Sequence, residues 1–305
     1  MNSTRFSHFR LTAYSDTGPL RHLYFFMLLL LYVFIMFSNL LLILVICVNR
    51  TLHEPMYLFL VSLFVNELYG SSGLFPLLLV QVLSDSHIVS APLCLLQIFV
   101  IYSYGGVEYF NLAVMSYDRY LAICCPLHYN TGMTCRKIAV LIAVTWLYPL
   151  LACVVIVYLS SSLTLCGNDI PKVYCDNYYV VKLACSNITA INIFELFAIF
   201  FTICAPLCGI LFTYLKIIRV CFSGSKETRQ KAVRTCTPQL ASLINFTFGS
   251  SFQTVQSRFN MKSVSSALQI FLSLYTLTCQ PLFNPSMYGL NLSKIRHVCK
   301  KLLFP

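Results

Sequence analysis

Long apolar stretches separated by short polar segments dominate this chain. Five stretches carry no Asp, Glu, Lys or Arg: residues 23–48, 138–168, 196–215, 235–257 and 263–293. Two more, residues 56–84 and 86–117, are interrupted only by Glu67 and Glu108. Each stretch is close to the roughly 20 residues that a helix needs to cross about 30 Å of hydrocarbon. The pattern therefore predicts an all-α membrane protein, a bundle of seven transmembrane helices.

The segments between the apolar stretches are short, and no low-complexity linker separates them. We expect one domain over residues 1–305, with spans at residues 23–48, 56–83, 92–122, 137–159, 191–220, 230–257 and 263–290. After the seventh span, apolar residues recur at helical spacing among lysines, from Ile295 to Leu302. This spacing predicts a short amphipathic helix over residues 292–303, lying on the inner membrane surface.

Composition supports a membrane location and fixes an orientation. The chain is 58% hydrophobic and 10% charged, whereas a soluble domain carries about 25% charged residues. With the N-terminus outside, fourteen Lys and Arg residues fall on the cytoplasmic side and seven on the outer side, as the positive-inside rule favours. The net charge of +11 then predicts attraction to anionic inner-leaflet lipid. We expect no nucleic-acid partner, because no basic soluble domain is present.

The predicted outer segments carry sites for covalent modification. We expect no cleavable signal peptide, and Asn2-Ser3-Thr4 is a glycosylation sequon at the outer terminus. Four cysteines face the same oxidising side: Cys94, Cys166, Cys175 and Cys185. Disulfides are expected there, although spacing alone leaves their pairing open.

Several polar residues lie deep in the predicted spans. Glu108 lies about 16 Å from Arg119 along the third span at 1.5 Å per residue, and Glu67 and Asn39 reach a similar depth. Asn284 joins them if the seventh helix is adjacent. Two carboxylates cannot both be bare anions in a low-dielectric interior. Either a small cation such as Na⁺ lies between Glu67 and Glu108, or one of the two is protonated within a hydrogen-bond network.

Several sequence motifs then indicate a protein family. Leu52-His53-Glu54-Pro55-Met56-Tyr57 follows the first span, and the run MSYDRYLAICCPLHY (Met115 to Tyr129) ends the third. Pro281-Leu282-Phe283-Asn284-Pro285-Ser286-Met287-Tyr288 lies in the seventh span. Together with Tyr174-Cys175-Asp176 and Trp146, these motifs make nearly the whole chain resemble an odorant (olfactory) receptor of the rhodopsin-like G-protein-coupled receptor family.

The chain departs from the family pattern at several positions. Glu67 stands where the family generally has Asp, and Gln239 replaces the usual His. Phe246-Thr247-Phe248-Gly249 replaces the aromatic-Tyr-Gly signature, and Asn291 replaces the usual Arg. These departures suggest the fish-type branch, whose ligands tend to be water-soluble.

The resemblance implies roles for individual residues. It implies the disulfides Cys94–Cys175 and Cys166–Cys185. It also implies that Arg119 engages a G protein once the inner ends of spans three and six separate, while Asp118 restrains Arg119 at rest. Residues of the coupling and switch machinery are then Asp118, Arg119, Tyr120, Tyr214, Asn284, Pro285 and Tyr288. The candidate sodium ligands are Glu67, Glu108 and Asn284.

The same resemblance places a ligand pocket in the outer half of the bundle. The expected lining is Ile101, Tyr102, Gly105, Gly106, Glu195, Ala198, Ile199, Thr202, Thr247, Ser250, Ser251, Thr254 and Arg258. Gly105 and Gly106 either leave space for a ligand or permit close helix packing. Arg258 is a candidate clamp for an anion and Glu195 for an amine, unless the two residues form a salt bridge or lie solvated at the rim.

The resemblance implies an odorant receptor at the plasma membrane, in the cilia of olfactory sensory neurons. A small, water-soluble odorant would activate a stimulatory, olfactory-type G protein and raise cAMP. The alternatives are a receptor of the same fold for a non-odorant small molecule and a transporter, although the sequence lacks the internal repeat typical of transporters. An enzyme is not expected, since no nucleophile motif, metal-ligand cluster or phosphate loop is present. Sodium is the one candidate cofactor.

Overall fold

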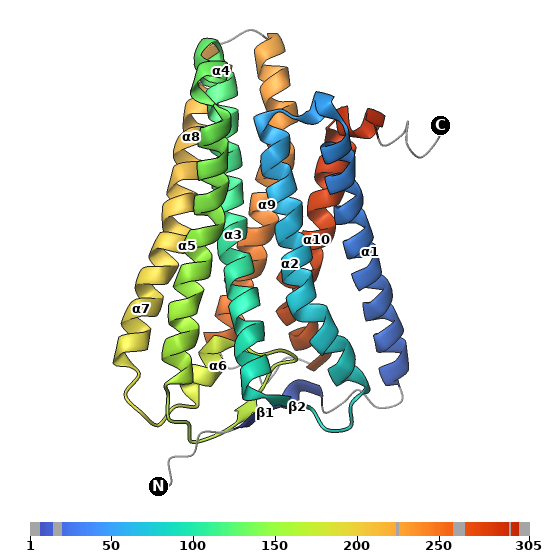
Figure 1. The fold of residues 1–305 in the computed structure, drawn as a ribbon, viewed down its shortest axis with the longest axis vertical. Coiled ribbons are helices and arrows are strands. Elements are labelled where there is room, and N and C mark those ends of the chain that lie inside the picture. The colour runs from blue at the N-terminus through green and yellow to red at the C-terminus, as the bar shows by residue number, and fades with distance from the viewer. Residues whose placement is uncertain (1–6, 15–19, 224–225, 259–265, 293, 299–305) are drawn as a thin grey trace.

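The computed structural model describes residues 7–14, 20–223, 226–258, 266–292 and 294–298. The long helices are α1 (Arg21–Val48), α2 (Pro55–Leu83), α3 (Ala91–Cys124), α5 (Cys135–Ser161), α9 (Lys226–Arg258) and α10 (Ser266–Asn291). A further long helix consists of α7 (Thr189–Ile199), a π-helical segment (Phe200–Cys204) and α8 (Ala205–Ser223). They run side by side as an elongated bundle (Figure 1).

The sequence explains where several helices begin. Pro55 opens α2 and Pro92 lies in the first turn of α3, where a missing N–H is tolerated. Thr134 caps α5, because its hydroxyl oxygen accepts from the backbone N–H of Lys137 at 3.3 Å. Each predicted span falls on one of the long helices, and their ends agree to within about four residues. Residues 263–265, the start of the seventh predicted span, lie outside the described residues.

Hydropathy agrees with a membrane location. Within the described ranges, five helices are long and apolar enough to cross a bilayer: α1, α2, α3, α5 and the helix from Thr189 to Ser223. They expose many large apolar side chains, such as Leu30 and Leu196, which is expected of helices that face lipid. Together with α9 and α10 they complete the expected all-α bundle of seven spans.

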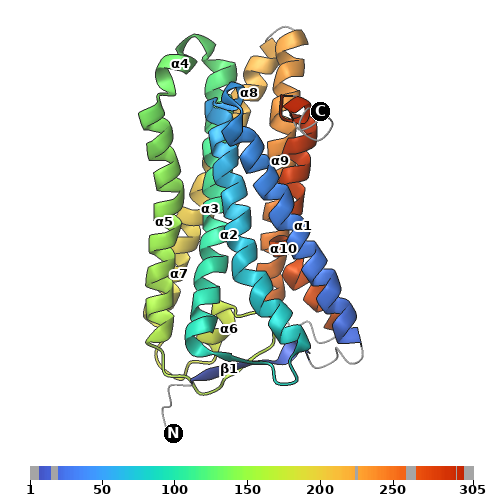
Figure 2. The same ribbon diagram turned by 45° about the vertical axis from the view of Figure 1, so that its right-hand side comes forward.

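Helix α3 occupies the centre of the bundle. It packs against α2, α5, α8 and α9, whereas α1 packs against α2 and α10. Figure 2 shows α1 crossing the outside of the bundle in front of α10. The short helices α4 (Tyr129–Gly132) and α6 (Asn177–Lys182) lie at opposite ends of the bundle, so they mark its predicted cytoplasmic and outer faces.

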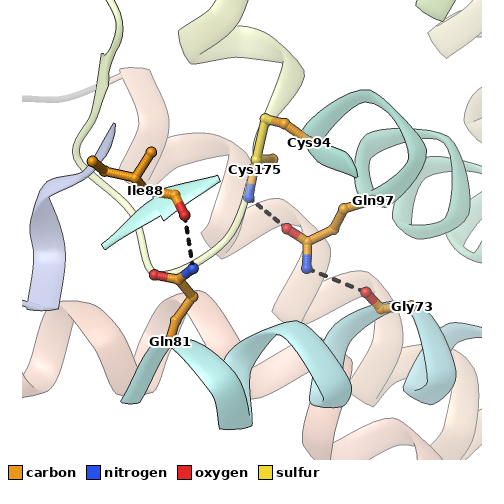
Figure 3. The surroundings of a disulfide bond; sticks show 6 residues. All are labelled: Gly73, Gln81, Ile88, Cys94, Gln97 and Cys175. Carbon is orange, nitrogen blue, oxygen red and sulfur yellow. Dashed lines mark hydrogen bonds between the residues drawn. A yellow bond between two sulfur atoms is a disulfide. The ribbon is translucent and has the colours of Figure 1, made fainter. Parts of the chain in front are cut away.

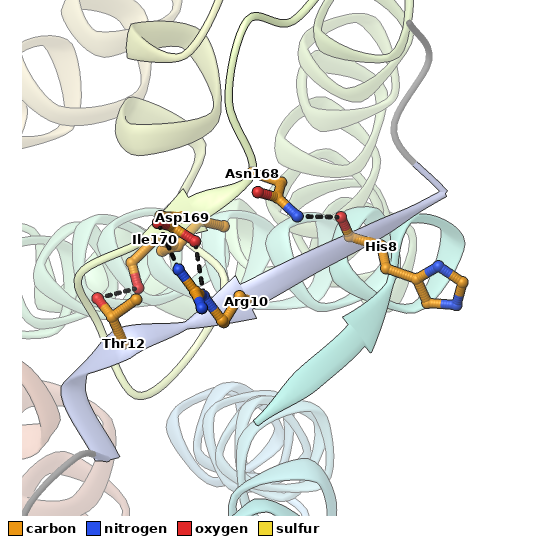
Figure 4. A network of polar contacts seen from close by, with 6 residues as sticks. All are labelled: His8, Arg10, Thr12, Asn168, Asp169 and Ile170. Atoms are coloured by element: carbon orange, nitrogen blue, oxygen red, sulfur yellow. Dashed lines mark hydrogen bonds and ion pairs between the residues drawn. The ribbon is translucent and has the colours of Figure 1, made fainter. Parts of the chain in front are cut away.

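A small sheet covers part of the outer end. Strand β1 (His8–Leu11) pairs antiparallel with β2 (Ile88–Ser90) and parallel with β3 (Asp169–Ile170). Figure 4 shows Arg10 on β1 reaching Asp169 on β3; Arg10 Nε and Nη2 donate to the two carboxylate oxygens at 2.8 and 2.9 Å. Three side chains of residues 9–14 turn inward and are buried, namely Phe9, Leu11 and Tyr14. This sheet was not predicted from the sequence.

The long outer loop is fixed to the helices by covalent and hydrogen bonds. The structure contains the disulfides Cys94–Cys175 and Cys166–Cys185, the pairing that the resemblance implied. Figure 3 shows Gln97 between the loop and α2. Its side-chain oxygen accepts from the Cys175 backbone N–H at 2.9 Å, and its nitrogen donates to the Gly73 carbonyl at 3.2 Å. The loop is therefore positioned over the outer ends of α2 and α3.

Two predictions concern the ends of the chain, where part of the sequence lies outside the described residues. Residues 294–298 are helical, in agreement with the start of the predicted surface helix, whereas its later part lies outside the described residues. Asn2, the predicted glycosylation site, also lies outside them.

Candidate functional site

A cavity of about 330 Å³ lies in the outer half of the bundle. Helices α3, α5, α7, α9 and α10 and the π-helical segment line it, together with loop residue Asp176 and Tyr178 of α6. Nine of the side chains expected at the ligand pocket lie along this cavity: Ile101, Tyr102, Gly105, Gly106, Glu195, Ala198, Ile199, Thr202 and Ser250. The structure thus brings together residues of three predicted spans that are far apart in the sequence.

On α9, the cavity lining agrees with the expected set at Ser250 and differs from it at other positions. Thr247 and Ser251 do not line the cavity, whereas Phe246, Ser250 and Gln253 do. These three residues share one face because they follow the i, i+4, i+7 spacing of a helix, while each residue one position further on is rotated by about 100°. The side chains of Thr254 and Arg258 lie outside the described part of the chain, so their predicted contacts stay predictions.

Helix α5 contributes a wall that sequence reasoning missed. Its cavity-lining residues are Pro149, Ala152, Cys153 and Ile156. The other missed lining residues are Tyr104, Tyr109, Asp176, Tyr178, Ile203, Phe246, Gln253, Thr276 and Leu277. The polarity pattern gave no signal for α5, because an apolar residue that faces a cavity looks the same in sequence as one that faces lipid. Asp176 could have been found, since it is an acidic residue directly after a disulfide cysteine.

The two neighbouring glycines serve different purposes. A Cβ atom on Gly106 would lie 2.7 Å from Cβ of Pro149 and 3.0 Å from Cγ2 of Thr202, so this glycine permits close packing of α3 against α5 and the π-helical segment. A Cβ atom on Gly105 would come no closer than 3.9 Å to a neighbouring heavy atom, Cζ of Phe246. Gly105 therefore leaves open space beside the cavity.

Polar contacts concentrate at the outer end of the cavity. Asp176 accepts hydrogen bonds from the Tyr102 hydroxyl at 3.0 Å and from the Tyr178 backbone N–H at 3.1 Å. The Lys172 ammonium nitrogen lies 3.8 Å from the other Asp176 oxygen and faces the rings of Tyr174 and Tyr179. Burial lowers the pKa of Lys172, and the nearby Asp176 carboxylate opposes that shift.

Glu195 is held by the outer loop. Its Oε1 accepts from Asn177 Nδ2 at 2.6 Å, and the Asn177 side-chain oxygen accepts from the Ser160 hydroxyl at 2.7 Å. This chain joins α7, α6 and α5 at the mouth of the cavity. A ligand amine that reaches Glu195 would meet a carboxylate already oriented by an amide.

The two buried glutamates meet below the cavity, as the sequence predicted. The Asn284 amide nitrogen donates to Glu67 and, at 2.9 Å, to Glu108. Tyr104 donates to Glu67 Oε2 at 2.9 Å, and Gln280 and Asn66 each donate to Glu108 at 3.0 Å. Both carboxylates are therefore bound by neutral donors of α2, α3 and α10, in a region that is fully buried.

This cluster, the carboxylate network, continues into α9. Gln280 donates to the Ser242 hydroxyl at 2.9 Å and accepts from Asn245 at 2.6 Å, while Ser242 donates to the Asn284 side-chain oxygen at 2.6 Å. Asn39 lies at the edge of the network, since its amide donates to the backbone carbonyls of Ile35 and Pro281. The network thus ties α2, α3, α9 and α10 together at mid-bundle.

Several residues expected to control G-protein coupling lie at the other end of α3, whereas Asn284 belongs to the carboxylate network. Asp118 accepts from Arg119 and, at 2.7 Å, from the Tyr129 hydroxyl. Gln239 of α9 donates to the Leu112 carbonyl of α3 at 2.7 Å. Tyr214 and Tyr288 are buried nearby. Arg119 is therefore held by its own helix while α9 is tied to α3, which is the arrangement expected of a resting receptor.

Comparison with known proteins identifies this architecture. The family model described as "Olfactory receptor" matches residues 28–305. Human olfactory receptor 11A1 is 34% identical over 301 residues, which cover 97% of this chain and 94% of the relative. Human olfactory receptor 6N1 is 36% identical over 92% of this chain and 89% of the relative. Squid rhodopsin shares the fold with a TM-score of 0.74, covering 90% of this chain and 82% of its own at 18% identity.

These relatives are mammalian, so they do not support the fish-type branch that the sequence departures suggested. The matches establish a multi-pass plasma-membrane receptor with the rhodopsin-like fold, which takes an odorant, couples to a G protein and is not an enzyme. The chain belongs to the olfactory receptor family.

Proposed function

We propose that this receptor binds a small odorant in the cavity and activates a stimulatory, olfactory-type G protein, which raises cAMP in the cilia of olfactory sensory neurons. The observation that carries this proposal is that one helix, α3, both lines the cavity and carries Arg119. Gly105 lines the cavity fourteen residues before Arg119, a distance of about 21 Å along α3. A ligand that moves α3 relative to α9 at the cavity therefore also moves the end of α3 that carries Arg119.

The lining favours an amphiphilic odorant. Apolar and aromatic side chains such as Phe246, Leu277 and Ile203 form most of the wall, whereas Asp176 and Glu195 lie toward its outer end. A ligand with an apolar body and one polar group buries its body against the apolar wall and places its polar group beside these two carboxylates. A polar group also makes the odorant water-soluble, and Arg258 and Thr254 stay candidates for contacting that group.

We also propose that a sodium ion exchanges with a proton shared by Glu67 and Glu108. The donor set fits a hard cation, because two carboxylates supply oxygen ligands at a buried, polar site. Asn284 contacts both carboxylates and would orient them toward the ion. When bound, sodium would supply the positive charge that lets both glutamates ionise.

The coupling proposal is tested by measuring cAMP in cells that express the chain with an olfactory-type stimulatory G protein. Pools of amine, acidic and neutral odorants are applied, and Arg119→Ala at matched surface expression serves as the control. A response to one pool that Arg119→Ala abolishes supports the proposal. Silence of the wild-type chain toward all pools, with verified surface expression, contradicts the proposed coupling.

A further inference from the structure

Tyr104 lies at the boundary between the cavity and the carboxylate network. Its side chain lines the cavity, and its hydroxyl donates to Glu67 Oε2 at 2.9 Å. Its backbone carbonyl accepts from Asn66 Nδ2 at 3.1 Å, and the same nitrogen donates to Glu108 at 3.0 Å. One residue of α3 therefore contacts both the ligand space and the buried acids.

The Tyr104 ring is confined on both sides. A Cβ atom on Gly70 of α2 would lie 2.4 Å from Cδ2 of Tyr104, so the ring occupies the space that this glycine leaves open. On the other side, the Phe246 ring meets Tyr104 edge-on, with centroids 6.2 Å apart and planes at 87°. Phe246 also lines the cavity. A ligand that presses on either ring thus cannot push Tyr104 into α2. Because the Tyr104 hydroxyl lies on the Cβ–Cγ axis, only a swing of the whole side chain about χ1 moves it away from Glu67.

The hydroxyl bond belongs to the resting arrangement. In the same structure Asp118 accepts from Arg119, and Gln239 ties α9 to α3. Glu67 is joined through Asn284 to Ser242 of α9, so a change at Glu67 reaches the helix that must separate from α3. If the Tyr104–Glu67 bond is made only in the resting receptor, its removal shifts the equilibrium toward the active receptor by the free energy of that bond.

We propose that Tyr104 is a positioning residue through which an odorant acts on the carboxylate network. Its hydroxyl bond to Glu67 stabilises the resting receptor, and a bound ligand that swings the Tyr104 side chain about χ1 breaks the bond and releases α9. The action of the ligand rests on the proposed function, whereas the restraint by Tyr104 exists without any ligand. By thermodynamic reciprocity, a bound ligand raises signalling less in a receptor that lacks the Tyr104–Glu67 bond.

The restraint is tested with Tyr104→Phe, which keeps the ring and removes the hydroxyl. The matched control is Tyr69→Phe, because the Tyr69 hydroxyl also joins α2 to α3, through Ser103 at 2.8 Å, but Tyr69 does not line the cavity and has no hydrogen bond to either glutamate among those that the structure gives. The first readout is odorant-free cAMP at matched surface expression. We expect a rise of about tenfold or more for Tyr104→Phe, the factor that one charge-assisted hydrogen bond supplies, and no rise for Tyr69→Phe.

A second readout needs neither odorant nor G protein. Cys236 of α9 is 5% exposed and packs with Leu112 of α3 and Ile210 of α8, so separation of these helices exposes its thiol. Maleimide labelling of Cys236 in the purified full-length receptor is followed by peptide mass spectrometry. Labelling should be faster for Tyr104→Phe than for the wild type and Tyr69→Phe. Glu67→Gln, which weakens the same bond at its acceptor, should act in the same direction.

The outcomes separate this inference from the proposed function. Faster labelling of Cys236 in Tyr104→Phe supports the restraint even if every odorant pool leaves the wild type silent, in which case the proposed coupling alone fails. If the wild type responds to an odorant while Tyr104→Phe and Glu67→Gln match it in basal cAMP and in Cys236 labelling, the inference is overturned.

Discussion

Gly105 and Gly106 show how much a single residue position decides in this receptor. Both were expected to border the ligand, and sequence alone left open whether they provide space or allow close packing. The structure gives each glycine one of the two roles. Gly106 lies against Pro149, whereas Gly105 faces Phe246 across open space.

These roles predict opposite results for one added methyl group. Gly106→Ala forces a contact of 2.7 Å with Pro149, and overpacking of this kind costs about 1–3 kcal/mol. We expect a lower unfolding temperature of the purified receptor and less of it at the cell surface. Gly105→Ala should fold as the wild type does, because its new methyl group has room, and should change only the dose response to odorants. Equal stability of the two variants would contradict this assignment.

The buried acids could be predicted at residue level, but their partners could not. The charges of Glu67 and Glu108 stand out within apolar stretches, and helical rise placed them at one depth. Tyr104, Gln280 and Asn66 carry common polar groups that become partners only through helix rotation, which the apolar pattern does not fix. For the same reason Thr247 and Ser251 were assigned to the cavity in place of Phe246 and Gln253.

A sodium prediction follows for this pair. If sodium exchanges with the shared proton, replacing sodium chloride by choline chloride should change the affinity for an active odorant in the wild type. Glu67→Gln combined with Glu108→Gln removes both carboxylates, so the dependence on sodium should disappear. The measurement is a dose response in each salt at equal ionic strength. A sodium effect of the same size in the double variant would rule out this site.

At the scale of elements, the sheet at the outer end joins segments that are far apart in the chain. β1 connects the first residues to the loop through the Arg10–Asp169 pair and through Tyr14, whose buried hydroxyl donates to the Val173 carbonyl at 2.7 Å. Its strands are two to four residues long, too short to give a clear alternating pattern. This explains why the sheet was missed, although the helices were found.

The sheet should loosen in acid. The Arg10 guanidinium lowers the pKa of Asp169 in the folded chain, mainly by hydrogen bonding. A depressed aspartate pKa stabilises the fold at neutral pH, and this contribution is lost as the pH falls from the ordinary value near 3.9 through the lower folded value. The protection factor of the Arg10 amide against hydrogen exchange, an amide that donates to Asn168, should therefore fall in that range. Asp169→Asn should show fast exchange already at neutral pH, and a pH-independent difference between wild type and variant would refute the link.

For the whole molecule, the apolar pattern was enough to predict seven spans, their order and their approximate ends, because crossing a bilayer demands long uninterrupted helices. The motifs at the start of α2, at the end of α3 and in α10 then indicated the family, and the family model confirmed it. The shape of the cavity needed the structure, since α5 contributes to it through Pro149 and Ala152, residues without distinctive chemistry. The mammalian relatives also show that a few departures from a motif do not suffice to assign a branch.

The central claim is that occupancy of the cavity controls Arg119 at the opposite end of α3. The most direct measurement is odorant-stimulated nucleotide exchange on a purified stimulatory G protein, with the receptor in nanodiscs and the odorant that proves active in cells. The wild type should accelerate exchange when the odorant is added. Arg119→Ala should still bind the odorant but leave exchange at its uncatalysed rate, because the cavity is intact and the coupling residue is missing. Odorant-dependent exchange that persists in Arg119→Ala would contradict the account.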